Sequence, residues 1–197
     1  TLTSSLQCAP GHKDIPELAY LNDFDSLRVQ KSIQELMSTN MLSQASKAKG
    51  ASVKTTYQLS ELARSYLGKY HKPSKTFQDK IRDKRNKLNS IFEQQLSKRN
   101  RNTYSLNNIK FRDKSDRVIV KMLYDAQRFI VENQHDIAYE LLQEAHRLAP
   151  DFFEVARVLA YFHQKSGNLS DAREQYELAI LLSPGTPQLH YWFGKFL

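Results

Sequence analysis

Residues 169–184 read LSDAREQYELAILLSP, and residues 135–150, thirty-four positions upstream, read HDIAYELLQEAHRLAP. The two stretches agree in register along their whole length. The positions that match are Ala138 and Ala172, Leu142 and Tyr176, Ala145 and Ala179, and Pro150 and Pro184. A period of this length predicts a repeated pair of antiparallel helices. The alanines allow the paired helices to approach closely, and each proline ends a second helix because it cannot continue one.

The rest of the repeat can be followed outward from these stretches. Leu159 and Ala160 hold a large-then-small pair in the first helix of the second unit, and Gly167 lies at its turn. These features resemble the tetratricopeptide repeat family over residues 117–197. The first copy departs from the family pattern at Asp125, where a large apolar residue is expected, so we expect a modified edge helix there. A third copy begins at Pro187.

The resemblance implies a binding function, in which the first helices line a groove that holds a peptide or a helix of a protein partner. Basic side chains among the candidates favour an acidic ligand, although the two tyrosines are equally well explained as packing residues. The candidate groove residues are Tyr124, Arg128, Arg157, Tyr161, Gln164 and Lys165.

Residues 1–72 show a different pattern, which predicts short helices around a β-hairpin. The first helix covers 15–21, and a second helix over 26–39 is capped by Asp25 and ends at Asn40. Two strands and a last helix follow, over 41–46, 54–60 and 61–70, with Gly50 at the tip of the hairpin loop. We expect Leu62, Tyr66 and Leu67 of the last helix to face inward. Two helices followed by a strand, a loop and a strand predict a winged helix.

The stretch from Ser32 to Tyr70 is similar to the winged-helix segment of signal-transduction ATPases with numerous domains (STAND). The residues that carry this likeness are Tyr57, Leu59, Leu62, Arg64, Tyr66 and Leu67. In that family the winged helix packs on a nucleotide-binding core and helps to hold the resting state, while downstream repeats act as the sensor. The resemblance implies that an ATPase core precedes this segment in a longer protein.

A DNA-binding winged helix is the alternative interpretation of the same region. Polar and basic residues at the outward face of the main helix and in the loop could contact bases and phosphates. Asp23 and Asp25, at the start of that helix, would repel a phosphate backbone. The candidate DNA contacts are Arg28, Lys31, Gln34, Lys47 and Lys49.

The net charge of +8 is concentrated in the middle of the chain, because residues 64–117 contain sixteen Lys or Arg against five Asp or Glu. Within this region, residues 75–98 are expected to form a long helix whose apolar stripe includes Ile81 and Leu88. The polar stretch 98–117 is expected to be either an ordered crossover or a mobile joint. A basic region of this kind binds nucleic acid or an acidic protein surface, or is a solvated helix face.

No catalytic or metal-binding pattern is present in the sequence. The single cysteine, Cys8, cannot form an internal disulfide, and the histidines lack the spacing of a zinc site. The phosphate-binding motif GxxxxGK[ST] is absent. We therefore expect no enzyme activity, no cofactor and no metal. No membrane segment or signal peptide is expected, and the reduced cysteine is typical of a cytoplasmic location.

Together these patterns predict a mainly α chain in three parts: a winged-helix-like domain over 1–72, a basic helical connector over 73–116, and tetratricopeptide repeats over 117–197. Because the chain starts with Thr1 and stops inside an expected helix, we expect a fragment of a longer protein. We interpret it as a non-catalytic interaction and sensor segment of a signalling ATPase. The alternatives are a DNA-binding regulator with a repeat sensor and a simple scaffold.

Overall fold

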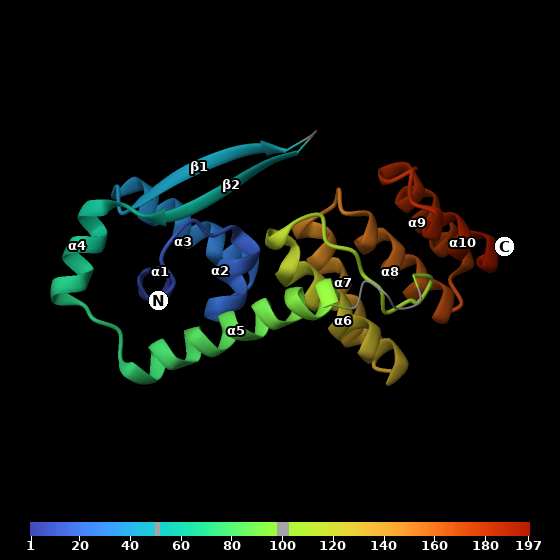
Figure 1. The fold of residues 1–197 in the computed structure, drawn as a ribbon, viewed down its shortest axis with the longest axis horizontal. Helices are drawn as coiled ribbons and strands as arrows, with labels where there is room; N and C mark the ends of the chain where they lie inside the picture. Colours follow the sequence, from blue (N-terminus) through green and yellow to red (C-terminus); the bar gives the residue numbers. More distant parts are fainter. Residues whose placement is uncertain (50–51, 98–102) are drawn as a thin grey trace. The chain divides into compact units, whose positions relative to one another are not determined.

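The computed structural model describes the backbone of residues 1–49, 52–97 and 103–197, and it divides into two compact units, Thr1–Ser90 and Ile91–Leu197 (Figure 1). The described part is mainly helical, with one two-stranded antiparallel sheet, as the sequence predicts. Gly50, expected at the hairpin tip, lies outside the described residues.

The amino-terminal unit is a small helical assembly with a β-hairpin. It contains α1 (Leu2–Cys8), α2 (Ile15–Asn22), α3 (Ser26–Ser38), β1 (Leu42–Lys49), β2 (Ser52–Leu59) and α4 (Glu61–Tyr70). The predicted cap of α3 is confirmed, because the Asp25 carboxylate accepts a hydrogen bond from the Arg28 amide at 2.8 Å. Asn40, after the end of α3, has a left-handed backbone with φ of 56°. The helix α1 has no counterpart among the predicted elements.

The hairpin is longer than the sequence pattern indicates, with strands paired from Leu42 opposite Leu59 to Lys49 opposite Ser52. A third extended segment joins its edge. The Lys13 amide donates to the Tyr57 carbonyl and the Tyr57 amide donates to the Lys13 carbonyl, each at 2.8 Å. The chain between α1 and α2 therefore adds a short bridge to β2.

The inward face of α4 differs from the prediction. Leu67 is buried as expected, but Leu62 is 82% exposed and Tyr66 is 52% exposed, whereas Ala63 is buried. The Ser60 hydroxyl accepts from the Ala63 amide and starts the helix directly after the buried Leu59. The helix begins at Glu61, as predicted, but its core face carries Ala63 and Leu67, which lie four residues apart, while the neighbouring face with Leu62 and Tyr66 is turned to solvent.

The long helix α5 (Lys75–Ser97) contributes its residues up to Ser90 to the first unit, where Ile81 and Leu88 are buried. A lysine fixes it to the end of α2. Lys84 Nζ donates to the carbonyls of Tyr20 and Leu21, at 2.9 and 3.2 Å, and to Asp23 at 2.6 Å. Hydrogen bonds from Lys80 and Lys84 lower the pKa of the Asp23 carboxyl. The amino-terminal half of the basic helix is thus anchored to its own unit by apolar burial and by the contacts of Lys84 with the end of α2.

The second unit is the repeat unit. It contains a one-turn 3-10 helix, Lys114–Asp116, followed by α6 (Arg117–Val131), α7 (His135–Leu148), α8 (Phe153–Lys165), α9 (Leu169–Leu182) and α10 (Pro187–Phe196). The helix α6 packs against α7, and α8 packs against α9. Pro150 and Pro184 each lie two residues past the end of a second helix, as predicted.

The repeated small residues form the interfaces between the helices. The matched positions Ala138 and Ala172, and likewise Ala145 and Ala179, are completely buried, and Tyr176 is 1% exposed. Asp125 stays out of the core at the surface of α6, where it pairs with Lys121. The first repeat thus keeps its core alanines while one first-helix position is replaced by a surface ion pair.

Candidate protein-interaction face

The first helices of the repeats, α6, α8 and α10, present a polar face that is built around a buried ion pair. Residues from these three helices make it up, and we call it the first-helix face: Tyr124, Gln127, Glu154, Arg157 and Gln188. Glu154 and Arg157 lie one turn apart on α8, with side chains 3% and 4% exposed, and their Oε2 and Nε atoms are 2.6 Å apart.

Residues 103–112, immediately before the 3-10 helix, lie on this face. The Leu106 carbonyl accepts from Gln127 Nε2 at 2.9 Å and from Arg157 at 3.3 Å, and the Asn107 carbonyl accepts from the Tyr124 hydroxyl at 3.2 Å. Ile109 is 1% exposed and belongs to the core formed by α6, α7 and α8. For the polar stretch 98–117 the sequence allowed either an ordered crossover or a mobile joint. Residues 103–112 of this stretch form an ordered crossover.

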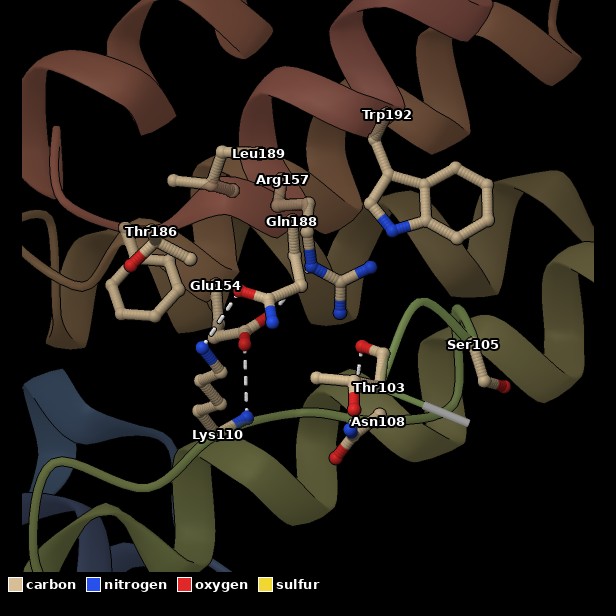
Figure 2. A pocket seen from close by; sticks show the side chains of 11 residues that line it. Thr103, Ser105, Asn108, Lys110, Glu154, Arg157, Thr186, Gln188, Leu189 and Trp192 are labelled. Atoms are coloured by element: carbon tan, nitrogen blue, oxygen red, sulfur yellow. Dashed lines mark hydrogen bonds and ion pairs between the residues drawn. The ribbon is translucent and has the colours of Figure 1, made fainter. Parts of the chain in front are cut away.

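The same segment also contacts α8 and α10. The Lys110 amide donates to Glu154 Oε1, and Lys110 Nζ donates to Gln188 Oε1, both at 2.9 Å (Figure 2). The rings of Tyr104 and Tyr191 lie 4.7 Å apart. The segment thus spans the first helices of all three repeats, and both main-chain groups and side chains hold it in the unit: Ile109 is buried, and the Arg112 side chain pairs with Asp116 and Asp151.

A small pocket remains between the segment and the helices. Its empty volume is about 250 Å³ and opens to solvent, and its lining includes Thr103, Asn108, Arg157 and Trp192. Figure 2 shows the Arg157 guanidinium turned into the space between α8, α10 and the segment. Its Nη1 atom is buried, and the part of the chain that the structure describes offers this atom of a charged group no acceptor.

The six groove residues named from the sequence occupy three different settings. Tyr124 and Arg157 meet at the bound segment. Arg128 is exposed at the other end of α6, near Asp125 at 3.8 Å and Glu132 at 3.9 Å.

Tyr161, Gln164 and Lys165 lie in the last turns of α8. Lys165 Nζ is 5.7 Å from the centre of the Tyr161 ring. Gln164 Oε1 accepts from the Tyr176 hydroxyl at 3.1 Å. The structure therefore brings two of the six candidates to the first-helix face and places the others elsewhere on the unit.

Two tyrosines near this face are shifted in their acid–base behaviour. Burial raises the pKa of Tyr124 to about 12, and burial likewise raises the pKa of Tyr176 to about 12. Both phenols are hydrogen-bond donors in the structure, to the Asn107 carbonyl and to Gln164. The neutral phenol is therefore the form that the folded repeat unit requires.

Sequence reasoning missed Glu154, Gln127 and the bound segment itself. The acid could have been found, because Glu154 and Arg157 are three residues apart in an otherwise apolar helix, FEVARVLAYF, and such an isolated pair indicates a buried salt bridge. Nothing comparable marks Leu106 or Asn107, since main-chain carbonyls carry no sequence signal.

The candidate DNA contacts lie in the amino-terminal unit. Arg28, Lys31 and Gln34 are exposed on α3, and the Arg28 guanidinium lies 4.0 Å from the centre of the Phe24 ring. Lys47 and Lys49 belong to β1, but their side chains lie outside the described residues. The three described residues share the solvent face of one helix.

Nowhere in the described residues do three His, Cys, Asp or Glu side chains gather in a way that could hold a metal ion. Nor do they contain a helix both long and apolar enough to cross a bilayer.

Comparison with known proteins agrees with the repeat architecture. Residues 130–191 match the family model described as tetratricopeptide repeat. The match runs from the end of α6 through α9 and into α10, which is the region where the 34-residue period is visible. No curated protein and no solved structure matches the chain. Tetratricopeptide repeats are protein-interaction modules, so the matched region defines a repeat unit of the protein-binding class.

Proposed function

We propose that this chain is a non-catalytic interaction and regulatory segment of a larger signalling ATPase. The repeat unit binds a protein or peptide partner, and the amino-terminal unit is a winged helix that relays this event to an ATPase core. The observation that carries the interaction role is the first-helix face, which holds main-chain groups of a stretch of polypeptide.

The order of elements in the amino-terminal unit supports the winged-helix role. The helices α2 and α3 precede the hairpin β1–β2, and the bridge between Lys13 and Tyr57 adds a third extended segment to the small sheet. The likeness to signal-transduction ATPases runs through β2 and α4, where its matching residues lie. In that family the repeats sense and the winged helix holds the resting state.

The test is ATP hydrolysis by the natural gene product that contains this segment. We expect that product to hydrolyse ATP, and we expect truncation after Ser90, which removes the repeat unit, to change the basal rate severalfold. The present chain alone is the control and should hydrolyse no ATP. The proposal would be contradicted by a gene product without ATPase activity, or by one whose basal rate of ATP hydrolysis is unchanged by the truncation.

DNA binding is the second candidate, favoured by the exposure of Arg28, Lys31 and Gln34 on one face of α3 beside the hairpin. The test is binding to random duplex DNA between about 50 and 200 mM salt, where phosphate contacts produce a steep loss of affinity. Charge reversal at Arg28 and Lys31 should abolish such binding if the regulator interpretation is right. If binding is unaffected by salt and by the charge reversals, or if there is no binding, the signalling segment is the better description.

A further inference from the structure

We infer that residues 103–112 are a built-in ligand of the repeat unit: they occupy the first-helix face as a partner peptide would, and a partner must displace them. This inference rests on the proposed interaction function and names the kind of partner. That partner is a peptide with a branched aliphatic anchor, recognised through main-chain groups and through this anchor.

The mode of contact distinguishes this segment from an ordinary connecting loop. Three main-chain groups, at Leu106, Asn107 and Lys110, are hydrogen-bonded by side chains of α6 and α8. Buried polar side chains that serve main-chain atoms bind many sequences, because every peptide offers the same carbonyl and amide groups. The first-helix face therefore suits the main chain of a peptide in general.

Selectivity comes from the anchor. Ile109 is 1% exposed and packs into the core beside α6 and α8, so a competing peptide needs an aliphatic side chain at the corresponding position. The neighbouring Lys110 contributes a contact from its side chain to Gln188. A peptide with an acid in place of the isoleucine would bury an unpaired charge and be rejected.

The built-in ligand leaves room for a better one. Arg157 lines the pocket, and the described residues offer its buried Nη1 atom no acceptor, although hydrogen bonds from charged donors are among the stronger ones in proteins. A partner that offers one more acceptor oxygen at this point gains an interaction that residues 103–112 do not make. This unfilled donor provides a reason for a partner to compete with a tethered segment.

The experiment uses a labelled peptide with the sequence of residues 103–112, TYSLNNIKFR, followed by fluorescence anisotropy. It is added to the native chain and to an opened variant in which residues 104–110 are replaced by Gly and Ser at the same length. We expect the peptide to bind the opened variant at least about tenfold more tightly. The reason is that a tethered segment competes at an effective concentration in the millimolar range.

Matched variants identify the site of binding. A peptide with Ile109→Asp should bind the opened variant at least about tenfold more weakly. Adding Gln127→Ala to the opened variant should weaken binding about threefold to tenfold, the range for one hydrogen bond. Arg173→Ala, on the exposed side of α9, should leave the affinity unchanged.

Circular dichroism first establishes that the opened variant is helical. If it is not, Ile109→Ala in the intact chain replaces it, and peptide binding should still be tighter than to the native chain because the anchor is weakened. The inference would be overturned if a folded opened variant does not bind the peptide, or if the opened and native chains bind it equally tightly. Neither result touches the ATP-hydrolysis test, so failure here is distinguishable from failure of the proposed function.

Discussion

Two arginines show how differently the two units use charge. Arg28, in the amino-terminal unit, is exposed on α3, whereas Arg157, in the repeat unit, is 3% exposed and pairs with Glu154 and the Leu106 carbonyl. The sequence assigned both residues to binding surfaces. The comparison teaches that a basic residue in a helical repeat can be committed largely to the chain's own groups, whereas an exposed one such as Arg28 is turned to solvent.

Removing a buried charge should cost much more stability than removing an exposed one. Arg157→Met leaves Glu154 buried without its counter-charge and should destabilise the repeat unit by about 3–5 kcal/mol. Lys31→Met, on the exposed face of α3, should change stability by less than about 0.5 kcal/mol. Trp192 is the single tryptophan and lies in α10, so its fluorescence during urea unfolding reports on the repeat unit.

A double variant, Glu154→Gln with Arg157→Met, tests the same account from the other side. It removes both charges and should recover most of the loss, because no unpaired ion remains buried. Equal destabilisation by the single and the double variant would mean that the pair's charges do not matter.

The second prediction concerns the corrected face of α4. Leu67→Ala should cost about 2–3 kcal/mol, because it empties a buried position, while Leu62→Ala at an exposed position should cost less than about 0.5 kcal/mol. Amide hydrogen exchange across α3 and α4 measures the stability of the amino-terminal unit. Similar losses of stability for the two variants would mean that Leu62 faces inward, as the sequence predicts.

The third prediction concerns how the stability of the repeat unit depends on pH. Tyr124 and Tyr176, both in the repeat unit, have folded pKa values of about 12, above the ordinary value near 10. Their contribution is therefore present below pH 10 and lost as pH rises from 10 through 12, by about 2 kcal/mol for each tyrosine. Tyr176→Phe should make the Trp192-monitored stability fall less over this interval. An identical fall in the variant would contradict the assignment to Tyr176.

The smallest expected effect is the loss of one helix cap in the amino-terminal unit. Asp25→Ala should destabilise α3 by about 1 kcal/mol, since the Arg28 amide loses its acceptor. Asp25→Asn keeps an acceptor oxygen and should cost only a few tenths of a kcal/mol, measured by hydrogen exchange at the start of α3. Equal effects would show that the charge of Asp25, and not its capping bond, matters.

The units also differ in how far their sequences predict them. In the repeat unit the alanine spacing and the prolines place α7 and α9 correctly, because those residues act locally and recur. In the amino-terminal unit α4 has its predicted bounds, but its inward face was predicted wrongly, because the small buried Ala63 gives a weaker apolar signal than the neighbouring Leu62 and Tyr66.

The candidate site was predicted only in part. Tyr124 and Arg157 were named as ligand-facing residues, and both do contact a peptide segment, but that segment belongs to the chain itself. Its position depends on main-chain carbonyls and on the burial of Ile109, which only the folded repeat can reveal.

The most direct test of the occupied face is amide hydrogen exchange of Lys110, measured by NMR on the native chain. This amide lies in no helix or strand and is held by the buried Glu154 carboxylate at 2.9 Å. The account predicts that it exchanges as slowly as amides in the middle of α8. Exchange at the rate of an unstructured peptide would contradict the claim that residues 103–112 are bound to the first-helix face.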